Sequence, residues 1–470
     1  MVNELPPSIV FLVSRIGGMM SLETLRATGS STDLPPTVKA TFRRRRIMVV
    51  AVVILASGAA VFGLTRPPAP VLVSDGDGRI SLINVVTGKP AYTVTDAVRA
   101  PDGSKILRAE EDGEATEVEV LNPESGEVVA STRVDGKLEI RAVSPFGGSV
   151  ALMTRRPKTA DLYVPEPRDH TSINVVWADG REPRTYTLEG NFEPETFSTD
   201  EETLFLLEFY PPSDPDRYFV RQLDLASGEI TSVETADQEL GIELNPEMRG
   251  HARAQAIAPD GSFLFSLYTI GKGEAPVHDP EDPETDRWAF VHTLNLKEKW
   301  SHCIFLPVPF GTKAEGAMSL GISGDGEHLF VIDAATERVA RIDAQRLEVE
   351  TVEQIPGLYS PQARPVAVGP DLVYIGMGDS VLEMGRDTLI PNAAFVVSTG
   401  NGSLGVLGLE LAPDGRTLRI AHGSSISVLD MPSERVIATL TSPEGTADSF
   451  LGDPVGDRVD LSLEWVIPGS

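Results

Sequence analysis

Histidine is the side chain best suited to holding a transition metal or moving a proton near neutral pH. No two histidines of this sequence stand at a metal-ligand spacing, although two of them, His170 and His278, fall in long, proline-rich stretches. A histidine in such a loop is more often a solvated surface residue than a ligand, so we predict no metal and no cofactor. The seven histidines are His170, His251, His278, His292, His302, His328 and His422.

Two acidic stretches carry the oxygen ligands that Ca²⁺ prefers, HDPEDPETD (278–286) and SDGDG (74–78). Neither has the full spacing of a twelve-residue calcium loop, so we expect solvated acidic loops. The sequence contains no GxSxG nucleophile motif and no GxxxxGK[ST] phosphate loop. The single cysteine, Cys303, lies in the strand-like run WSHCIFLP and is expected to be a buried small side chain.

The charge of the chain is strongly acidic, with 40 Lys and Arg against 69 Asp and Glu and a formal net charge of −29. Residues 1–66 depart from this balance, because eight basic residues there outnumber three acidic ones. The remainder of the chain therefore carries −34. Such an excess repels phosphate backbones, which makes nucleic acid an improbable partner of residues 67–470.

One apolar run, IMVVAVVILASGAAVFGL (47–64), is long enough to cross a bilayer core. Four arginines, Arg43 to Arg46, precede it and favour a cytoplasmic N-terminus. We therefore predict a basic and disordered cytoplasmic segment (1–46), a transmembrane helix (47–64), a Pro-rich linker (65–70) and an extracytoplasmic domain (71–470). The alternative is a cleaved signal peptide followed by secretion, since small residues lie within the run.

From residue 71 onward the sequence consists of short runs rich in Val, Ile and Leu, separated by Gly, Asp, Asn and Pro. The clearest unit, LAPDGRTLRIAHGSSISVLDMPSERVIATL, is expected to contain four strands with a PDG turn after the first. Related units recur every 40 to 50 residues, which is the pattern of a β-propeller. We predict an all-β domain of seven or eight four-stranded blades, eight by the count of repeats.

The two ends of this region each look like part of a blade. The first piece, VLVSDGDGRISLINVVTGKPAYTV, has three strands, and the last, DSFLGDPVGDRVDLSL, resembles the missing beginning. N- and C-terminal strands are thus expected to close the ring and remove an exposed sheet edge.

Together, the PDG turns, strands such as HLFVID and the TG-like turns NVVTG, NPESG and DLASG resemble the YVTN and WD-like families of bacterial propellers. The resemblance covers about residues 71–466. It implies the fold, and it implies functions that range from binding scaffolds to lactonases and parts of envelope machines.

Three consecutive units have a long loop between their second and third strands: 156–172, 210–217 and 271–287. Strand order places these loops on the face opposite the PDG turns, and neighbouring blades place them side by side. Their tyrosines, tryptophan and arginines are suited to contacts with a partner. The predicted binding residues are Tyr163, Arg168, Tyr210, Arg217, Tyr218, Arg287 and Trp288.

The sequence therefore favours a non-enzymatic function for a membrane-anchored extracytoplasmic propeller. The expected partner is a protein, a peptide or an envelope polymer that lies on the three long loops. The alternative is a lactonase-like hydrolase, with acidic and histidine side chains around a metal in the central funnel.

Overall fold

The computed structural model divides the chain into two units, residues 1–67 and 68–470, and every described residue belongs to the second. Among these described residues, no helix is both long and apolar enough to cross a membrane. The apolar run 47–64 and its flanking arginines lie outside them. The described residues are 71–74, 79–84, 87, 89–156, 165–235, 248, 251–270, 277–279, 282–314, 316–397, 405–412, 415–422, 425–431, 435–441 and 467–468.

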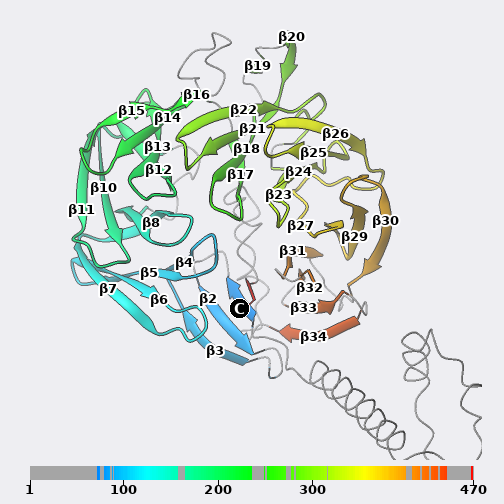
Figure 1. Cartoon of the computed structure of the whole chain (residues 1–470), viewed down its shortest axis with the longest axis horizontal. Coiled ribbons are helices and arrows are strands. Elements are labelled where there is room, and N and C mark those ends of the chain that lie inside the picture. The colour runs from blue at the N-terminus through cyan, green and yellow to red at the C-terminus, as the bar shows by residue number, and fades with distance from the viewer. Residues whose placement is uncertain are drawn as a thin grey trace, which may run out of the picture. The chain divides into compact units, whose positions relative to one another are not determined.

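The described residues form β-strands, which make seven four-stranded sheets, one five-stranded sheet and one two-stranded sheet. Successive sheets lie side by side around a ring, the arrangement of a β-propeller (Figure 1). In most of the larger sheets the chain runs through the four strands in order, and neighbouring strands are antiparallel. The all-β propeller fold is thus confirmed.

The first four sheets are built from strands that follow one another along the chain, apart from one strand near the C-terminus. They are β1 (Val71–Ser74), β2 (Ile80–Asn84) and β3 (Lys89–Val94) with β35 (Ile467–Pro468); β4 (Ala97–Arg99), β5 (Ile106–Asp112), β6 (Ala115–Leu121) and β7 (Val128–Asp135); β8 (Leu138–Val143), β9 (Ser149–Thr154), β10 (His170–Trp177) and β11 (Arg184–Glu189); β12 (Asn191–Phe197), β13 (Thr203–Tyr210), β14 (Arg217–Asp224) and β15 (Ile230–Ser232).

The remaining sheets continue this plan, with one added edge strand and one small hairpin. They are β16 (Glu234–Thr235), β17 (His251–Ile257), β18 (Phe263–Thr269), β21 (Ala289–Asn295) and β22 (Trp300–Phe305); the hairpin β19 (Val277–Asp279) and β20 (Asp282–Arg287); β23 (Met318–Ile322), β24 (His328–Asp333), β25 (Arg338–Asp343) and β26 (Glu348–Gln354); β27 (Val366–Val368), β28 (Leu372–Met377), β29 (Ser380–Gly385) and β30 (Pro391–Val396); β31 (Val406–Leu411), β32 (Thr417–His422), β33 (Ser425–Asp430) and β34 (Arg435–Thr441).

The repeated PDGS sequence forms the turn between the first and second strands, as the sequence predicts. The backbone N–H of Ser104 donates to the Asp102 carboxylate at 3.0 Å, and Gly103 takes a φ of +75°. The second copy has the same geometry, with a 3.0 Å bond from Ser262 to Asp260. The aspartate therefore caps the turn while the glycine supplies the left-handed residue that the turn requires.

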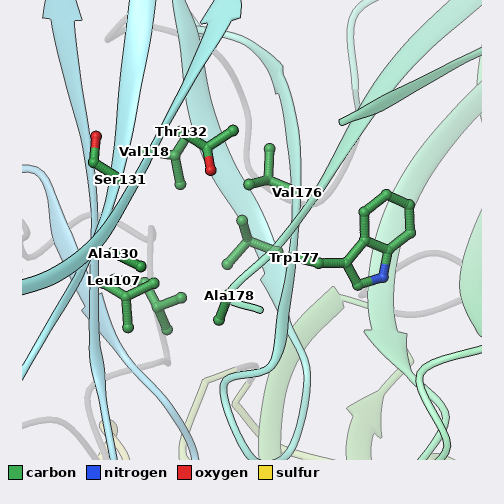
Figure 2. Close-up of a pocket in the computed structure, with 10 residues that line it drawn as sticks. Leu107, Val118, Ala130, Ser131, Thr132, Val176, Trp177 and Ala178 are labelled. Atoms are coloured by element: carbon green, nitrogen blue, oxygen red, sulfur yellow. The ribbon is translucent and has the colours of Figure 1, made fainter. Parts of the chain in front are cut away.

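Figure 2 shows a small cavity between the β4–β7 sheet and the β8–β11 sheet. Its walls are mainly apolar and include Leu107, Val118, Val150 and Val176. The volume is about 10 Å³, which is roughly what one water molecule needs. The cavity is therefore a packing gap between two sheets and too small to hold a substrate.

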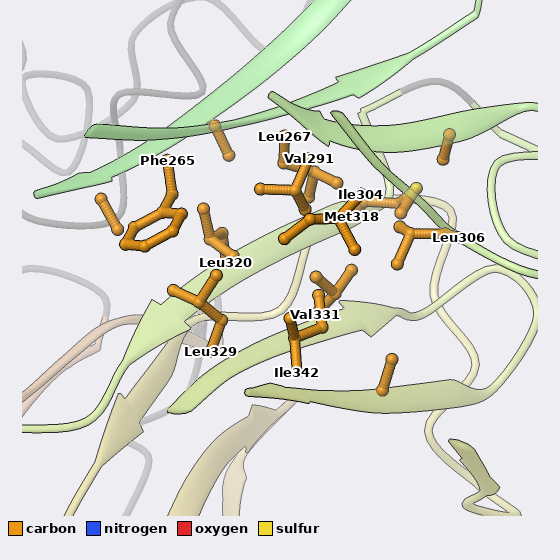
Figure 3. Close-up of a cluster of buried hydrophobic side chains, with 14 of the residues drawn as sticks. Phe265, Leu267, Val291, Ile304, Leu306, Met318, Leu320, Leu329, Val331 and Ile342 are labelled. Carbon is orange, nitrogen blue, oxygen red and sulfur yellow. The ribbon is translucent and has the colours of Figure 1, made fainter. Parts of the chain in front are cut away.

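The core consists of side chains from facing sheets. In Figure 3, Phe265 and Val291 of one sheet pack against Met318, Leu329 and Val331 of the next. Strands β18, β21 and β24 are buried at nearly every position, so the side chains on both faces of these inner strands are covered by packing. Each fully buried side chain of this kind contributes about 1.5–3 kcal/mol of hydrophobic stabilisation.

The sheet nearest the N-terminus contains strands from both ends of the region. Strand β35 pairs with β1 in an antiparallel ladder, with Leu72 opposite Ile467. The segment expected to fill this place, 448–463, lies outside the described residues. The segment that begins near Val366 forms the complete β27–β30 sheet.

Candidate functional site

The long loops join the second and third strands of three consecutive sheets, so strand order places them on one face of the propeller. We call this the loop face, and the opposite side, which carries the PDG turns, the turn face. The loops connect β9 to β10, β13 to β14 and β18 to β21. A backbone hydrogen bond of 3.1 Å from Arg168 N to Pro212 O joins the first loop directly to the second. The described end of the first loop and the second loop therefore form one surface.

Arg168 is held by side chains of β12, the first strand of the next sheet. Its Nη2 forms an ion pair with Glu193, and its Nε donates to Asn191 Oδ1 at 2.6 Å. Asn191 in turn donates from Nδ2 to the carbonyl oxygen of Glu166 at 3.1 Å. Since Asn191 is fully buried, these bonds fasten the end of the first loop to a fixed strand.

Tyr210 and Arg217 occupy the two ends of the second loop and contact each other. The Arg217 guanidinium carbon lies 5.1 Å from the centre of the Tyr210 ring, a cation–π distance. Arg217 Nη1 also lies 3.2 Å from Asp216 Oδ1. Tyr210 is 45% exposed, so this pair presents a flat ring and a charged group to solvent.

Tyr218 corrects the expectation from the sequence, because its side chain belongs to the core and is only 5% exposed. The ring centres of Phe209 and Tyr268 lie 5.3 Å and 6.0 Å from its own. Strand β14 already begins at Arg217, so the alternation of a strand directs the next residue inward. Tyr218 supports the loop from below and offers no contact surface of its own.

The third loop returns to the sheet at Arg287 and Trp288, which are both half-buried. The Trp288 side chain packs against the cluster that contains Tyr218 and Tyr268. Its carbonyl oxygen accepts a 2.9 Å hydrogen bond from Ile270 N, which closes the base of the loop. Tyr163 lies outside the described residues, as does the segment 271–276 that begins this loop.

Arg156, Asn191 and Glu193 are site residues that the sequence analysis missed. Arg156 follows β9 and its Nη2 lies 2.7 Å from Glu193 Oε2, so one carboxylate binds two arginines. The available signal was a pair of glutamates, Glu193 and Glu195, at alternate positions of the strand NFEPETF. Glu193 is only 8% exposed, and the prediction from the sequence took account of charges in the loops alone.

The two loop histidines and the two acidic stretches lie only partly within the described residues. His170 begins β10, whereas His278 lies in β19, whose side chains are not described. Residues 280 and 281 of HDPEDPETD and residues 75–78 of SDGDG lie outside the described residues. Cys303 is half-buried in β22 and packs against the core.

One group of described residues, Asp325, Glu327 and His328, has its ligand atoms close enough together for a metal ion. An arginine already lies against it: Arg386 Nη2 is 2.7 Å from Asp325 Oδ2 and 3.0 Å from His328 Nδ1. The Arg386 side chain is 9% exposed. A metal ion would have to displace this buried guanidinium, so the group is an ion-pair network between the β23–β26 and β27–β30 sheets.

This network predicts a loss of stability in acid. Burial alone would raise the pKa of Asp325, but bonds from Ser323, the Glu327 N–H and Arg386 outweigh it and lower the pKa to about 2. The folded state therefore holds this carboxylate ionised where an unfolded chain, with a pKa of about 3.9, binds a proton. The contribution is complete above about pH 5 and is lost as the pH falls through about 2.

We expect Asp325→Asn to lower the free energy of unfolding by about 1 kcal/mol at pH 7, allowing for screening of a partly exposed pair. The difference from the wild type should shrink between about pH 5 and pH 2, as measured by urea unfolding. Asp260→Asn is the control, because it neutralises a carboxylate that accepts the equivalent turn bond from Ser262 N and has no ion pair with a described residue. A difference that stays constant down to pH 2 would contradict the assignment.

Comparisons with known proteins reveal structural likeness only. No family model matches the chain, and no curated protein matches its sequence. The dihydro-heme d1 dehydrogenase NirN in complex with DHE is 14% identical, with a TM-score of 0.47 over 80% of this chain and 74% of that one. BamB from Moraxella catarrhalis is 12% identical, with a TM-score of 0.40 over 74% of this chain and 90% of that one.

A third solved structure, apo AztD from Citrobacter koseri, is 11% identical, with a TM-score of 0.36 over 70% of this chain and 95% of that one. At these identities and TM-scores the likeness carries no argument about activity or partner. The function has to be inferred from the side chains of this chain itself.

Proposed function

We propose that this chain is a binding or scaffold module whose partner lies on the loop face. The observation that carries the proposal is the hydrogen bond from Arg168 N to Pro212 O, which makes one continuous surface from loops of two sheets. On that surface Tyr210 is exposed and Arg217 lies against its ring. Tyrosine and arginine are enriched among residues that dominate binding energy at protein interfaces. The partner is a protein, a peptide or an envelope polymer across loops 156–172, 210–217 and 271–287.

The proposal includes a closed ring of eight blades. Eight sheets of four or five strands support the count, and the pairing of β35 with β1 supports closure. A closed ring would hold the loops of neighbouring sheets in fixed register, because no blade can separate from the next without opening the ring.

The proposal also includes a membrane anchor. Residues 47–64 would form a single transmembrane helix, with Arg43 to Arg46 in the cytoplasm and the propeller outside. Secretion after signal cleavage is the alternative. Protease treatment of intact cells and the N-terminal sequence of the mature chain would distinguish an anchored propeller from a secreted one.

Tyr210→Ala is expected to weaken binding by about 1–3 kcal/mol, because it removes an exposed aromatic contact without opening the core. The measurement uses a partner captured by the immobilised full chain from extracts of the source cells, followed by its affinity for each variant. Phe146→Ala, on the turn face and 38% exposed, is the control and should change affinity little. Equal affinities of the wild type and the Tyr210 variant would place the partner elsewhere.

A further inference from the structure

Two arginines of the loop face share one buried carboxylate. Arg156 Nη2 lies 2.7 Å from Glu193 Oε2, and Arg168 Nη2 pairs with Glu193 Oε1. Arg156 and Arg168 flank the first long loop, whereas Glu193 belongs to β12 in the next sheet. We call these three residues the arginine clamp. It lies where the first loop meets the second, since Arg168 N also binds Pro212 O.

The charges of the arginine clamp do not cancel. Two guanidinium groups face one carboxylate, which leaves a local charge of +1 on a chain whose net charge is −29. The Glu193 side chain is 10% exposed, whereas Arg156 and Arg168 are 25% and 26% exposed. The negative group is therefore covered and both positive groups still reach solvent.

The guanidinium groups also keep unused donors. Each has five N–H bonds arranged in a planar fork. Within the described part of the chain, Arg156 donates only to Glu193, and the Arg168 side chain only to Glu193 and Asn191. Glu193 fixes the two forks, so a second anion would meet donors that need little further ordering.

We propose that the arginine clamp binds a carboxylate of the partner, an acidic side chain or a C-terminus of a peptide segment. This inference rests on the proposed function and names the chemistry recognised at the same surface. One carboxylate matches the single excess positive charge and the planar geometry of the forks. A phosphate group carries nearly two negative charges, which exceeds that local charge and meets stronger repulsion from the acidic chain.

The test uses the purified full chain and a fluorescein-labelled tetraglutamate peptide, followed by fluorescence anisotropy at low salt. A tetraglutamine peptide is the control for the label and backbone. Arg156→Gln should weaken tetraglutamate binding about tenfold, because the local charge falls to zero while the Arg168–Glu193 pair remains. Glu193→Gln should strengthen binding several-fold, because it removes the competing carboxylate. Arg181→Gln, which disrupts an exposed pair with Asp179, should have no effect.

The opposite effects of Arg156→Gln and Glu193→Gln on peptide binding distinguish recognition of a carboxylate from structural support. Both substitutions break the same ion pair, so a purely structural clamp would make them shift binding and melting temperature in the same direction. Equal binding of tetraglutamate and tetraglutamine, or weakened binding by Glu193→Gln, would overturn the proposal. Competition by inorganic phosphate at lower concentration than acetate would identify a phosphate site and would also overturn it.

Failure of this inference can be told apart from failure of the proposed function. If Tyr210→Ala weakens the captured partner and Arg156→Gln does not, the loop face still binds that partner and the carboxylate assignment is wrong. If tetraglutamate binding depends on Arg156 and the partner is insensitive to Tyr210, the clamp is an anion site separate from the partner surface.

Discussion

Replacing Tyr218 by alanine is expected to lower the free energy of unfolding by about 3–5 kcal/mol, the cost of truncating a large buried aromatic side chain. Tyr218 packs between Phe209 and Tyr268, and its backbone exchanges hydrogen bonds of 3.0 and 2.8 Å with Met248. The change would leave a cavity beneath the second long loop. Denaturant unfolding of both chains measures the difference.

Tyr210→Ala is the matched control, since Tyr210 lies eight positions earlier and is 45% exposed. Surface substitutions of this kind usually change stability by no more than about 0.5 kcal/mol. The two substitutions should therefore differ in effect: Tyr218→Ala lowers stability, whereas Tyr210→Ala weakens binding. A Tyr218 variant as stable as the wild type would mean that this side chain is not part of the core.

Deleting residues 446–470 is expected to lower the free energy of unfolding even more, by an amount on the order of 5 kcal/mol or larger. This is comparable with the whole stability of many domains. The deletion removes β35 and leaves the edge of β1 without a partner. The cluster around Leu72, Ile80 and Leu82 belongs to the sheet that would lose this strand. Thermal unfolding, together with light scattering for edge-to-edge association, measures the result.

Deleting only Gly469 and Ser470 is the control, because these residues follow β35. That shorter deletion should leave the melting temperature close to the wild type. If the 446–470 deletion melts at the same temperature and stays monomeric, the terminal strands do not close the ring.

The sequence predicts most of the fold because each blade is a local unit. Four strands joined in order need only short apolar runs and turn residues such as those of PDGS, and both are visible without a structure. The strand that pairs with β1 was harder to place. It pairs across almost the whole length of the chain, and the pairing involves Ile467 and Pro468 beyond the segment 448–463 that the pattern had indicated. A long-range pair leaves no local signal.

The site was predicted less well, for reasons visible in two residues. Tyr218 and Tyr210 flank the same short loop, and one is buried while the other is exposed because the strand begins one residue before Tyr218. A shift of one residue reverses the direction of a side chain in a strand. Glu193 was missed because its role depends on two arginines that are 37 and 25 positions away in the sequence.

The central claim is that a partner lies on the loop face, and photocrosslinking tests it most directly. A photoreactive phenylalanine analogue at position 210 reports on the loop face, and the same analogue at position 146 reports on the turn face. Tyr210 and Phe146 are 45% and 38% exposed, so both sites are comparably accessible. On irradiation of source cells expressing each full chain, we expect a discrete crosslinked species from position 210 and none from position 146. A crosslink from position 146 alone would contradict the account.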